Sequence, residues 1–391
     1  AMWRMTNPRF PELCRYYRTL YGGTDFGGIA GMFGRKSLVA VICSLCFAAM
    51  TTTALAGGEA GNLTLRDIGW KYVGYETEAT DNGAVNVVNP MFVHYMLPAE
   101  RQHQYPVVFV HGGGGQGTDW LETPDGRDGW IDYFVADGWD VYVVDRPGHG
   151  RSQSNASCGD ASVGFANTAF ISRLATSDAS LWPGGEPTPT NDAVVFWTAG
   201  GATAPYCGNE VAADTISALL NEIGPAIIIA HSAGGGSTFM VPDRNAANVV
   251  GIIAFEAAGG QPVAPGFGGT PPAIAGWEVS PPFPADFEPV MDNGCPMQGD
   301  QPSELVNYDR IPLVLVASEM GLGIFGETDG RRAIQCQAAA WRQAGVDAAA
   351  VFFPDRGLSG GGHFAMAQLD SAAYAREFIR LATQIEVGSD K

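Results

Sequence analysis

The chain has 391 residues, of which 46% are hydrophobic, and a formal net charge of −19 at neutral pH. Such an acidic balance argues against partners with a negatively charged surface, so we expect binding neither to nucleic acid nor to anionic membranes. The length and apolar content suffice for one large domain with a buried core. The sequence shows no internal repeat and no long linker.

The N-terminal region has the features of an export signal. Two basic residues precede an apolar run over 38–50, and Ala54-Leu55-Ala56 matches an A-x-A cleavage site. The run is too short for a transmembrane anchor. We therefore expect residues 1–56 to be an N-terminal extension and secretory signal peptide, of which 1–31 is given no fold. The mature chain, residues 57–391, would be secreted or periplasmic and would stay off the membrane after cleavage.

Four of the seven cysteines lie beyond the predicted signal, and these are Cys158, Cys207, Cys295 and Cys336. An even number of cysteines in an exported protein favours two disulfides. The sequence leaves three pairings open. Pairing Cys158 with Cys207 and Cys295 with Cys336 would close each of two long insertions onto itself. No two of these cysteines have the spacing of a zinc site, so we expect no metal.

Two strand-like runs each end in a glycine-rich turn. The apolar run 105–110 is followed by His111-Gly112-Gly113-Gly114-Gly115-Gln116-Gly117, and the run 138–145 by Arg146-Pro147-Gly148-His149-Gly150-Arg151-Ser152. Glycine allows backbone N–H groups to approach a developing oxyanion without obstruction from side chains. The first turn therefore predicts an oxyanion loop, although a glycine run can also be a flexible loop.

Ser232 stands in the most informative segment of the chain. The buried-strand run Ala226-Ile227-Ile228-Ile229-Ala230-His231 breaks into Ser232-Ala233-Gly234-Gly235-Gly236. This A-x-S-x-G pattern is typical of a nucleophile elbow, where small neighbours permit a sharp turn from strand to helix. The alternative is a helix start packed against a core strand. With both glycine-rich turns upstream, we expect Ser232 to be a nucleophile, with the N–H groups of Gly113 and Ala233 as the oxyanion hole.

A serine nucleophile needs a base, and the chain has six histidines. His111 and His149 end strands beside the site, and His231 adjoins the serine. Only His363 follows Ser232 in the sequence. It lies in Gly360-Gly361-Gly362-His363-Phe364, between an expected strand at 349–353 and an amphipathic stretch at 371–383. We therefore predict His363 as the base.

Two glutamates compete to be the acid of the triad. Glu256 ends the apolar run 249–255, and Glu319 ends the next run, 311–318. Asp309 and Asp355 rank lower because neither directly follows its strand. A charged residue at a strand end is ordinarily just solvated, so both assignments remain open at this point.

The three motifs in this order resemble the α/β-hydrolase superfamily and, within it, secreted bacterial esterases of the esterase 713 type. The resemblance extends from Met91-Phe92-Val93-His94-Tyr95-Met96 through the elbow and Phe255-Glu256 to Gly362-His363-Phe364-Ala365-Met366-Ala367-Gln368. It implies a mostly parallel central sheet flanked by helices, with cap insertions. It also implies that the acid follows strand six, which favours Glu256 over Glu319. The chain departs from the group at Gly113-Gly114, where an adjacent cysteine pair is expected.

The resemblance implies a serine carboxylesterase that works without a cofactor on a small-molecule ester. An amidase or a carbon–carbon bond hydrolase would use the same triad. A depolymerase of polyesters or cell-wall esters, and a noncatalytic binding protein, are further alternatives. The sequence does not specify the acid or alcohol part of the substrate, or the oligomeric state.

Two insertions are expected in the catalytic domain, a cap at about 153–210 and a proline-rich segment at about 261–308. Both contain aromatic residues, among them Trp182, Trp197 and Trp277. These side chains would either line a pocket for a hydrophobic or aromatic ester or form satellite core.

Overall fold

The computed structural model describes residues 59–154, 158, 167–201, 206–257, 265–266, 270–272, 277–283, 287–321 and 329–389. The predicted extension and signal peptide at 1–56 lie outside these residues. In the part of the chain that is described, no helix is both long enough and apolar enough to cross a bilayer.

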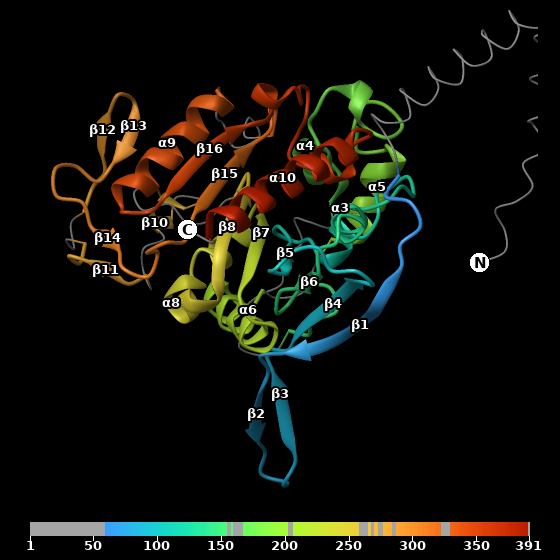
Figure 1. The fold of residues 1–391 in the computed structure, drawn as a ribbon, viewed down its shortest axis with the longest axis horizontal. Coiled ribbons are helices and arrows are strands. Elements are labelled where there is room, and N and C mark those ends of the chain that lie inside the picture. The colour runs from blue at the N-terminus through green and yellow to red at the C-terminus, as the bar shows by residue number, and fades with distance from the viewer. Residues whose placement is uncertain are drawn as a thin grey trace, which may run out of the picture. The chain divides into compact units, whose positions relative to one another are not determined.

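An eight-stranded sheet in the order β1-β4-β6-β5-β7-β8-β15-β16 forms the centre of the fold (Figure 1). Strand β4 pairs antiparallel with both of its neighbours, and the pairs from β6 to β16 are all parallel. The expected mostly parallel sheet is therefore confirmed. The strands are β1 (Leu65–Val73), β4 (Met91–Pro98), β5 (Val107–Val110), β6 (Val141–Asp145), β7 (Ala226–His231), β8 (Val249–Phe255), β15 (Leu313–Ala317) and β16 (Ala348–Phe352).

Helices cover both faces of this sheet. Helices α3 (Trp130–Ala136) and α10 (Ser371–Ser389) share one buried cluster with Ile227 and Ile229 of β7. Helices α6 (Asn209–Ile223) and α9 (Gly330–Gln343) share the other cluster with Ile228. Because successive side chains of a strand point to opposite faces, the uninterrupted isoleucine run places β7 in the middle of three layers.

The remaining elements are short. The helices are η1 (Gly117–Trp120), α4 (Thr168–Leu174), η3 (Ala179–Leu181), α5 (Asp192–Ala199), α7 (Gly234–Thr238), α8 (Pro242–Asn245), η4 (Ala246–Asn248), η6 (Phe353–Arg356) and η7 (Ala365–Ala367). The strand pairs are β2 (Glu76–Ala79) with β3 (Val85–Val88), β9 (Pro265–Gly266) with β10 (Thr270–Pro272), β11 (Val279–Ser280) with β14 (Glu304–Leu305), and β12 (Val290–Asp292) with β13 (Cys295–Met297).

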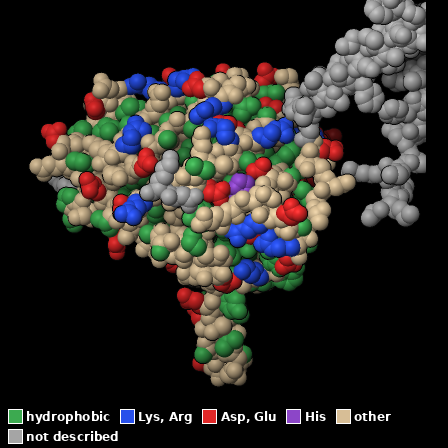
Figure 2. Space-filling model, in the orientation of Figure 1, with side chains coloured by type: hydrophobic (Ala, Val, Ile, Leu, Met, Phe, Trp, Pro, Cys, Tyr) green, Lys and Arg blue, Asp and Glu red, His purple; other side chains and the backbone are tan. Residues whose placement is uncertain are grey.

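The hairpin β2–β3 projects from the end of β1 (Figure 1). Both Val85 and Val87 on it are more than half exposed. Figure 2 shows hydrophobic and acidic side chains together on this projection.

Aromatic side chains of both insertions belong to the core. Trp182 is buried in the cluster beneath α3 and α10, and Trp197 packs against the same cluster. Trp277 is buried on the opposite face, with its ring centroid 5.4 Å from that of Trp341 in α9. Of the two expectations for these three tryptophans, pocket lining and satellite core, the structure agrees with packing in the core.

The structure contains the disulfides Cys158–Cys207 and Cys295–Cys336. This is the pairing that closes each insertion onto itself. The second disulfide attaches β13, at the end of the proline-rich segment, to helix α9.

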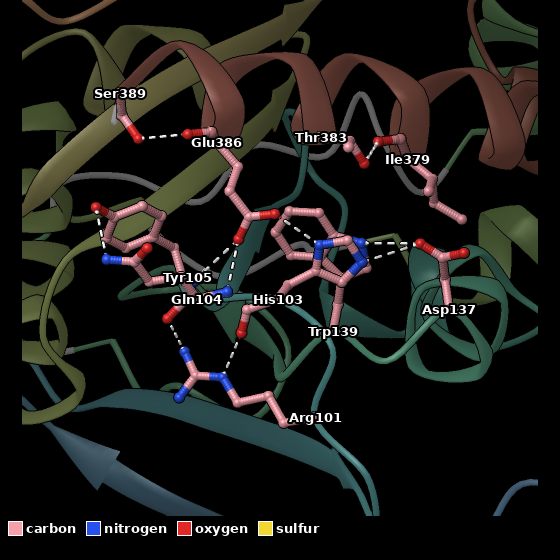
Figure 3. Close-up of polar contacts among 10 residues, drawn as sticks. All are labelled: Arg101, His103, Gln104, Tyr105, Asp137, Trp139, Ile379, Thr383, Glu386 and Ser389. Carbon is pink, nitrogen blue, oxygen red and sulfur yellow. Dashed lines mark hydrogen bonds and ion pairs between the residues drawn. The ribbon is translucent and has the colours of Figure 1, made fainter. Parts of the chain in front are cut away.

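A histidine joins the C-terminal helix to the body of the domain (Figure 3). Nδ1 of His103 lies 2.8 Å from Oε2 of Glu386 in α10, and its Nε2 lies 3.1 Å from Oδ2 of Asp137. The ring also stacks on Trp139 with centroids 3.7 Å apart. Burial by itself lowers the pKa of His103, but the two carboxylates outweigh it and raise the pKa above 6.5.

These contacts predict a pH-dependent contribution of His103 to stability. Because its folded-state pKa exceeds its unfolded-state value, the stabilisation is fully present below about pH 6.5 and is lost as the pH rises through the folded-state pKa. His103→Gln should therefore lower the Tm by more at about pH 6 than at about pH 9, as measured by calorimetry. Glu386→Gln is the control that should reduce this pH dependence. An equal loss of Tm at both pH values would contradict the charged contact.

Candidate active site

Ser232 occupies a strained turn between β7 and α7. Its φ is +49°, in the left-handed region that residues other than glycine rarely adopt. The turn is held from both sides, since the Ser232 N–H donates to the Phe255 carbonyl at 3.1 Å and the Gly235 N–H donates to the Ser232 carbonyl at 3.0 Å. The serine is half-buried. This is the geometry expected of a nucleophile elbow.

Glycines let the elbow pack against the loop that follows β5. A Cβ atom at Gly234 would overlap the carbonyl oxygen of His111. A Cβ atom at Gly112 would lie only 3.0 Å from the Cβ of Ser232. The glycine-rich loop and the serine are therefore in direct proximity, as the sequence motifs predict.

The backbone N–H groups of Gly113 and Ala233 are the expected oxyanion donors. Both residues are half-buried, and neither N–H donates to a protein acceptor within the described ranges. Farther along the loop, the Gly117 N–H donates to Oδ1 of the buried Asp145 at 2.6 Å, which attaches the loop to the end of β6. The hydrogen bond that anchors the loop therefore uses the Gly117 N–H and not the N–H of Gly113 or Ala233.

His363 and Glu256 form a buried pair. Nδ1 of His363 lies 2.6 Å from Oε2 of Glu256, and both side chains are almost completely inaccessible to solvent. The other carboxylate oxygen accepts hydrogen bonds from the N–H of Ser318, at 2.9 Å, and from its hydroxyl. Glu256 has a φ of +45°, which places a second strained residue at the carboxyl edge of the sheet. Every oxygen of this buried carboxylate therefore has a donor.

Glu319, the alternative acid, points elsewhere. It is exposed, and its Oε2 accepts a hydrogen bond from the N–H of Gly360 at 2.7 Å. The structure thus places Glu256 on the His363 ring and Glu319 on the loop that precedes His363.

His231 contacts His363, which its position beside the elbow did not predict. Its Nε2 lies 2.9 Å from the His363 carbonyl oxygen, and the two rings are 4.5 Å apart. Burial, followed by the nearby His363, lowers the pKa of His231 well below 6.5. A neutral ring with its proton on Nε2 donates to this carbonyl. His231 therefore ties the backbone of His363 to the strand that carries Ser232.

Asp119 is a half-buried group beside the oxyanion loop that the motifs did not reveal. Its Oδ2 accepts a hydrogen bond from the Gln116 N–H at 3.3 Å, and Gly115 packs so closely that a Cβ atom would overlap this oxygen. Burial raises the pKa of Asp119 to about 8. It is the third residue of η1, where an acidic side chain ordinarily serves as part of a helix cap, so the sequence carries no signal for this raised pKa.

No group of three or more His, Cys, Asp or Glu side chains in the described residues is arranged to hold a metal ion.

Comparisons with known proteins agree with this architecture. A family model described as "alpha/beta hydrolase fold" matches residues 105–268. "Probable secreted lipase phiG" of Fungal sp. (strain ATCC 74256) is 30% identical over 303 residues, which are 70% of this chain and 80% of the relative. A solved structure described as "The Atomic Resolution Structure of a Novel Bacterial Esterase" aligns with a TM-score of 0.63 and 18% identity, over 83% of this chain and 98% of that chain. At that identity the similarity concerns the fold.

The close packing at the elbow predicts a large effect of one added methyl group. Gly234→Ala should destabilise the protein by about 2 kcal/mol, because the Cβ atom meets a backbone carbonyl that cannot rotate away. Gly388→Ala in α10 is the matched control, since a Cβ atom there meets nothing within 4 Å. It should leave stability unchanged or raise it by up to about 1 kcal/mol. Urea unfolding compares the two, and equal stabilities would contradict the packing argument.

Proposed function

The chain belongs to the α/β-hydrolase family, and from that premise we propose that it is a secreted serine carboxylesterase that uses Ser232, His363 and Glu256. The observation that carries the proposal is the buried His363–Glu256 hydrogen bond, joined through His231 to the strained turn that bears Ser232. Such a pair orients a histidine for proton transfer to and from a serine.

Each group has a role in the reaction. Because Nδ1 of His363 is engaged by Glu256, Nε2 is the nitrogen that receives the Ser232 proton as the serine oxygen attacks the ester carbonyl. The N–H groups of Gly113 and Ala233 stabilise the resulting oxyanion. The imidazolium then protonates the leaving alcohol, and the neutral ring activates a water molecule that hydrolyses the acyl-enzyme.

The buried carboxylate stabilises the imidazolium that forms during each step. Glu256 also fixes the tautomer, since a carboxylate accepts only from an Nδ1 that carries hydrogen. The two hydrogen bonds from Ser318 hold the carboxylate in place while the charge on the ring changes. No cofactor takes part in this scheme.

The substrate is a small-molecule ester, and we propose a hydrophobic acyl or aryl group. Support comes from the relative named as a secreted lipase, because lipases act on esters of hydrophobic acids. Both disulfides and the same relative support the secreted or periplasmic location. Residues 1–56 would be removed on export, and 57–391 would be the catalytic domain.

A panel of p-nitrophenyl and aryl esters of graded chain length tests this function, together with labelling by a serine-reactive phosphonate. Turnover and phosphonate attachment at Ser232 are expected. Absence of both would favour a noncatalytic protein. Labelling with turnover of amides alone, or of insoluble polyester alone, would favour the amidase or depolymerase alternatives.

The serine and the histidine should act as one unit. Ser232→Ala and His363→Ala should each lower kcat by about 10⁵- to 10⁶-fold, and the double variant should be little worse than either single one. Steady-state kinetics on the best ester measures all three. Additive losses would show that the two side chains do not serve the same step.

Substitution of each glutamate tests which of the two is the acid of the triad. Glu256→Gln should lower kcat by about 10³- to 10⁴-fold, because an amide can hold the wrong tautomer of His363. Glu319→Gln keeps an amide oxygen that can accept from the Gly360 N–H and should change kcat by about twofold or less. The reverse ranking in the same assay would assign the triad acid to Glu319.

A further inference from the structure

Arg146 is a buried cation beside the oxyanion loop. Its side chain is almost fully inaccessible, and one guanidinium NH₂ group donates to the Gly112 carbonyl at 2.7 Å. The other donates to the Tyr206 hydroxyl at 3.1 Å and lies 3.5 Å from the Ala233 carbonyl oxygen. Within the described ranges no ion pair includes Arg146. Such a costly arrangement requires an explanation.

His111 acts on the same carbonyl. Its Nδ1 lies 2.8 Å from the Gly112 oxygen, and its Nε2 accepts a hydrogen bond from the Arg146 backbone N–H at 3.0 Å. Accepting at Nε2 requires a neutral ring, whose Nδ1–H then donates to Gly112. Burial, and next the charge of Arg146, lower the pKa of His111 well below 6.5 and keep it neutral. Two side-chain donors therefore converge on one carbonyl oxygen, which also accepts a longer hydrogen bond, at 3.4 Å, from the Gly115 N–H.

That carbonyl belongs to the same peptide unit as the Gly113 N–H. A trans peptide is planar, so its C=O and N–H point in opposite directions. The hydrogen bonds from Arg146 and His111 to the oxygen thus fix the direction of the Gly113 N–H. A charged donor on the oxygen also polarises the peptide and makes its N–H a stronger donor. Glycine at 112 and 113 gives the backbone wide conformational freedom, and the 3.4 Å hydrogen bond from the Gly115 N–H is the longest of the three on this oxygen, so the two side chains supply the stronger restraint.

We propose that Arg146 is a positioning residue of the oxyanion hole, which holds and polarises the Gly112–Gly113 peptide so that the Gly113 N–H is directed at the reacting carbonyl oxygen. This inference rests on the proposed esterase function. Tyr206 in turn holds the guanidinium, with its ring 5.0 Å from the guanidinium carbon and its hydroxyl 2.5 Å from Oδ1 of Asn209. Tyr206 immediately precedes the disulfide-bonded Cys207, so the predicted cap is connected to the oxyanion loop through Arg146.

The test compares Arg146→Met with Arg66→Met. Arg66 likewise uses both guanidinium NH₂ groups, which donate to the two carboxylate oxygens of Asp140, but it lies on β1 outside the site. Arg146→Met should lower kcat by about 100-fold with KM changed by about threefold or less, as for loss of an oxyanion donor. Arg66→Met should leave kcat unchanged. A trifluoromethyl ketone, which forms an oxyanion on Ser232, should lose affinity for Arg146→Met in the same proportion as kcat/KM.

Two milder variants keep the test decisive if Arg146→Met fails to fold. Tyr206→Phe removes one hydroxyl from the guanidinium and should lower kcat about fivefold, the equivalent of one lost hydrogen bond. Arg146→Lys keeps the charge without the planar fork and should fall between Arg146→Met and the wild type.

The outcomes separate the two proposals. A wild-type protein that turns over no ester and is not labelled by the phosphonate would overturn both. An active wild type whose Arg146 and Tyr206 variants keep their kcat and their ketone affinity would overturn the role of Arg146 alone. A higher KM with unchanged kcat in both the Arg146 and Tyr206 variants would also overturn the role of Arg146, because that pattern reports a loss of ground-state binding.

Discussion

The hydrogen bond between the buried Glu256 carboxylate and the His363 ring is the interaction on which the rest of the site depends. Moving a carboxylate out of water costs several kcal/mol, so it is tolerated only where every oxygen has a donor. Ser318 supplies two of these donors and His363 the third. The α-carbon of Gly321 lies so close that a side chain there would overlap the carboxylate. The strand ends and loops around Glu256 thus supply the hydrogen bonds and the space that one buried carboxylate requires.

Close backbone packing brings the elbow at Ser232 and the oxyanion loop together. The elbow at Ser232 and the loop after β5 approach each other at positions where Gly112 and Gly234 carry no side chain. Buried histidines then connect the parts, since His111 bonds to the loop and His231 to the backbone of His363. Both rings have pKa values lowered well below 6.5, so they stay neutral at neutral pH and act as fixed hydrogen-bond partners. This leaves His363 as the base in the proposed mechanism.

The insertions contribute to the core as well as to the surroundings of the site. Trp182 and Trp277 are buried against opposite faces of the sheet, so their burial adds to stability and says little about the substrate. The cap instead contacts the candidate site at Tyr206, whose hydroxyl accepts a hydrogen bond from Arg146. In the inference drawn from these contacts, the cap influences the reaction by holding the oxyanion peptide, which is a different role from lining a hydrophobic pocket.

Local sequence predicted the main strands along the chain, the elbow at Ser232 and the resemblance to the α/β-hydrolase superfamily, because isoleucine runs, glycine turns and chain order are properties of short segments. It also predicted His363 as the base by its place in the chain. The strand ends by themselves left Glu256 and Glu319 open, and only the family resemblance favoured Glu256. The path of the loop before His363 decides which carboxylate meets the ring. Local sequence likewise gave no sign that Arg146 is buried in the interior. Burial of a charged side chain depends on partners that lie far away in the chain, and the tertiary structure alone brings those partners together.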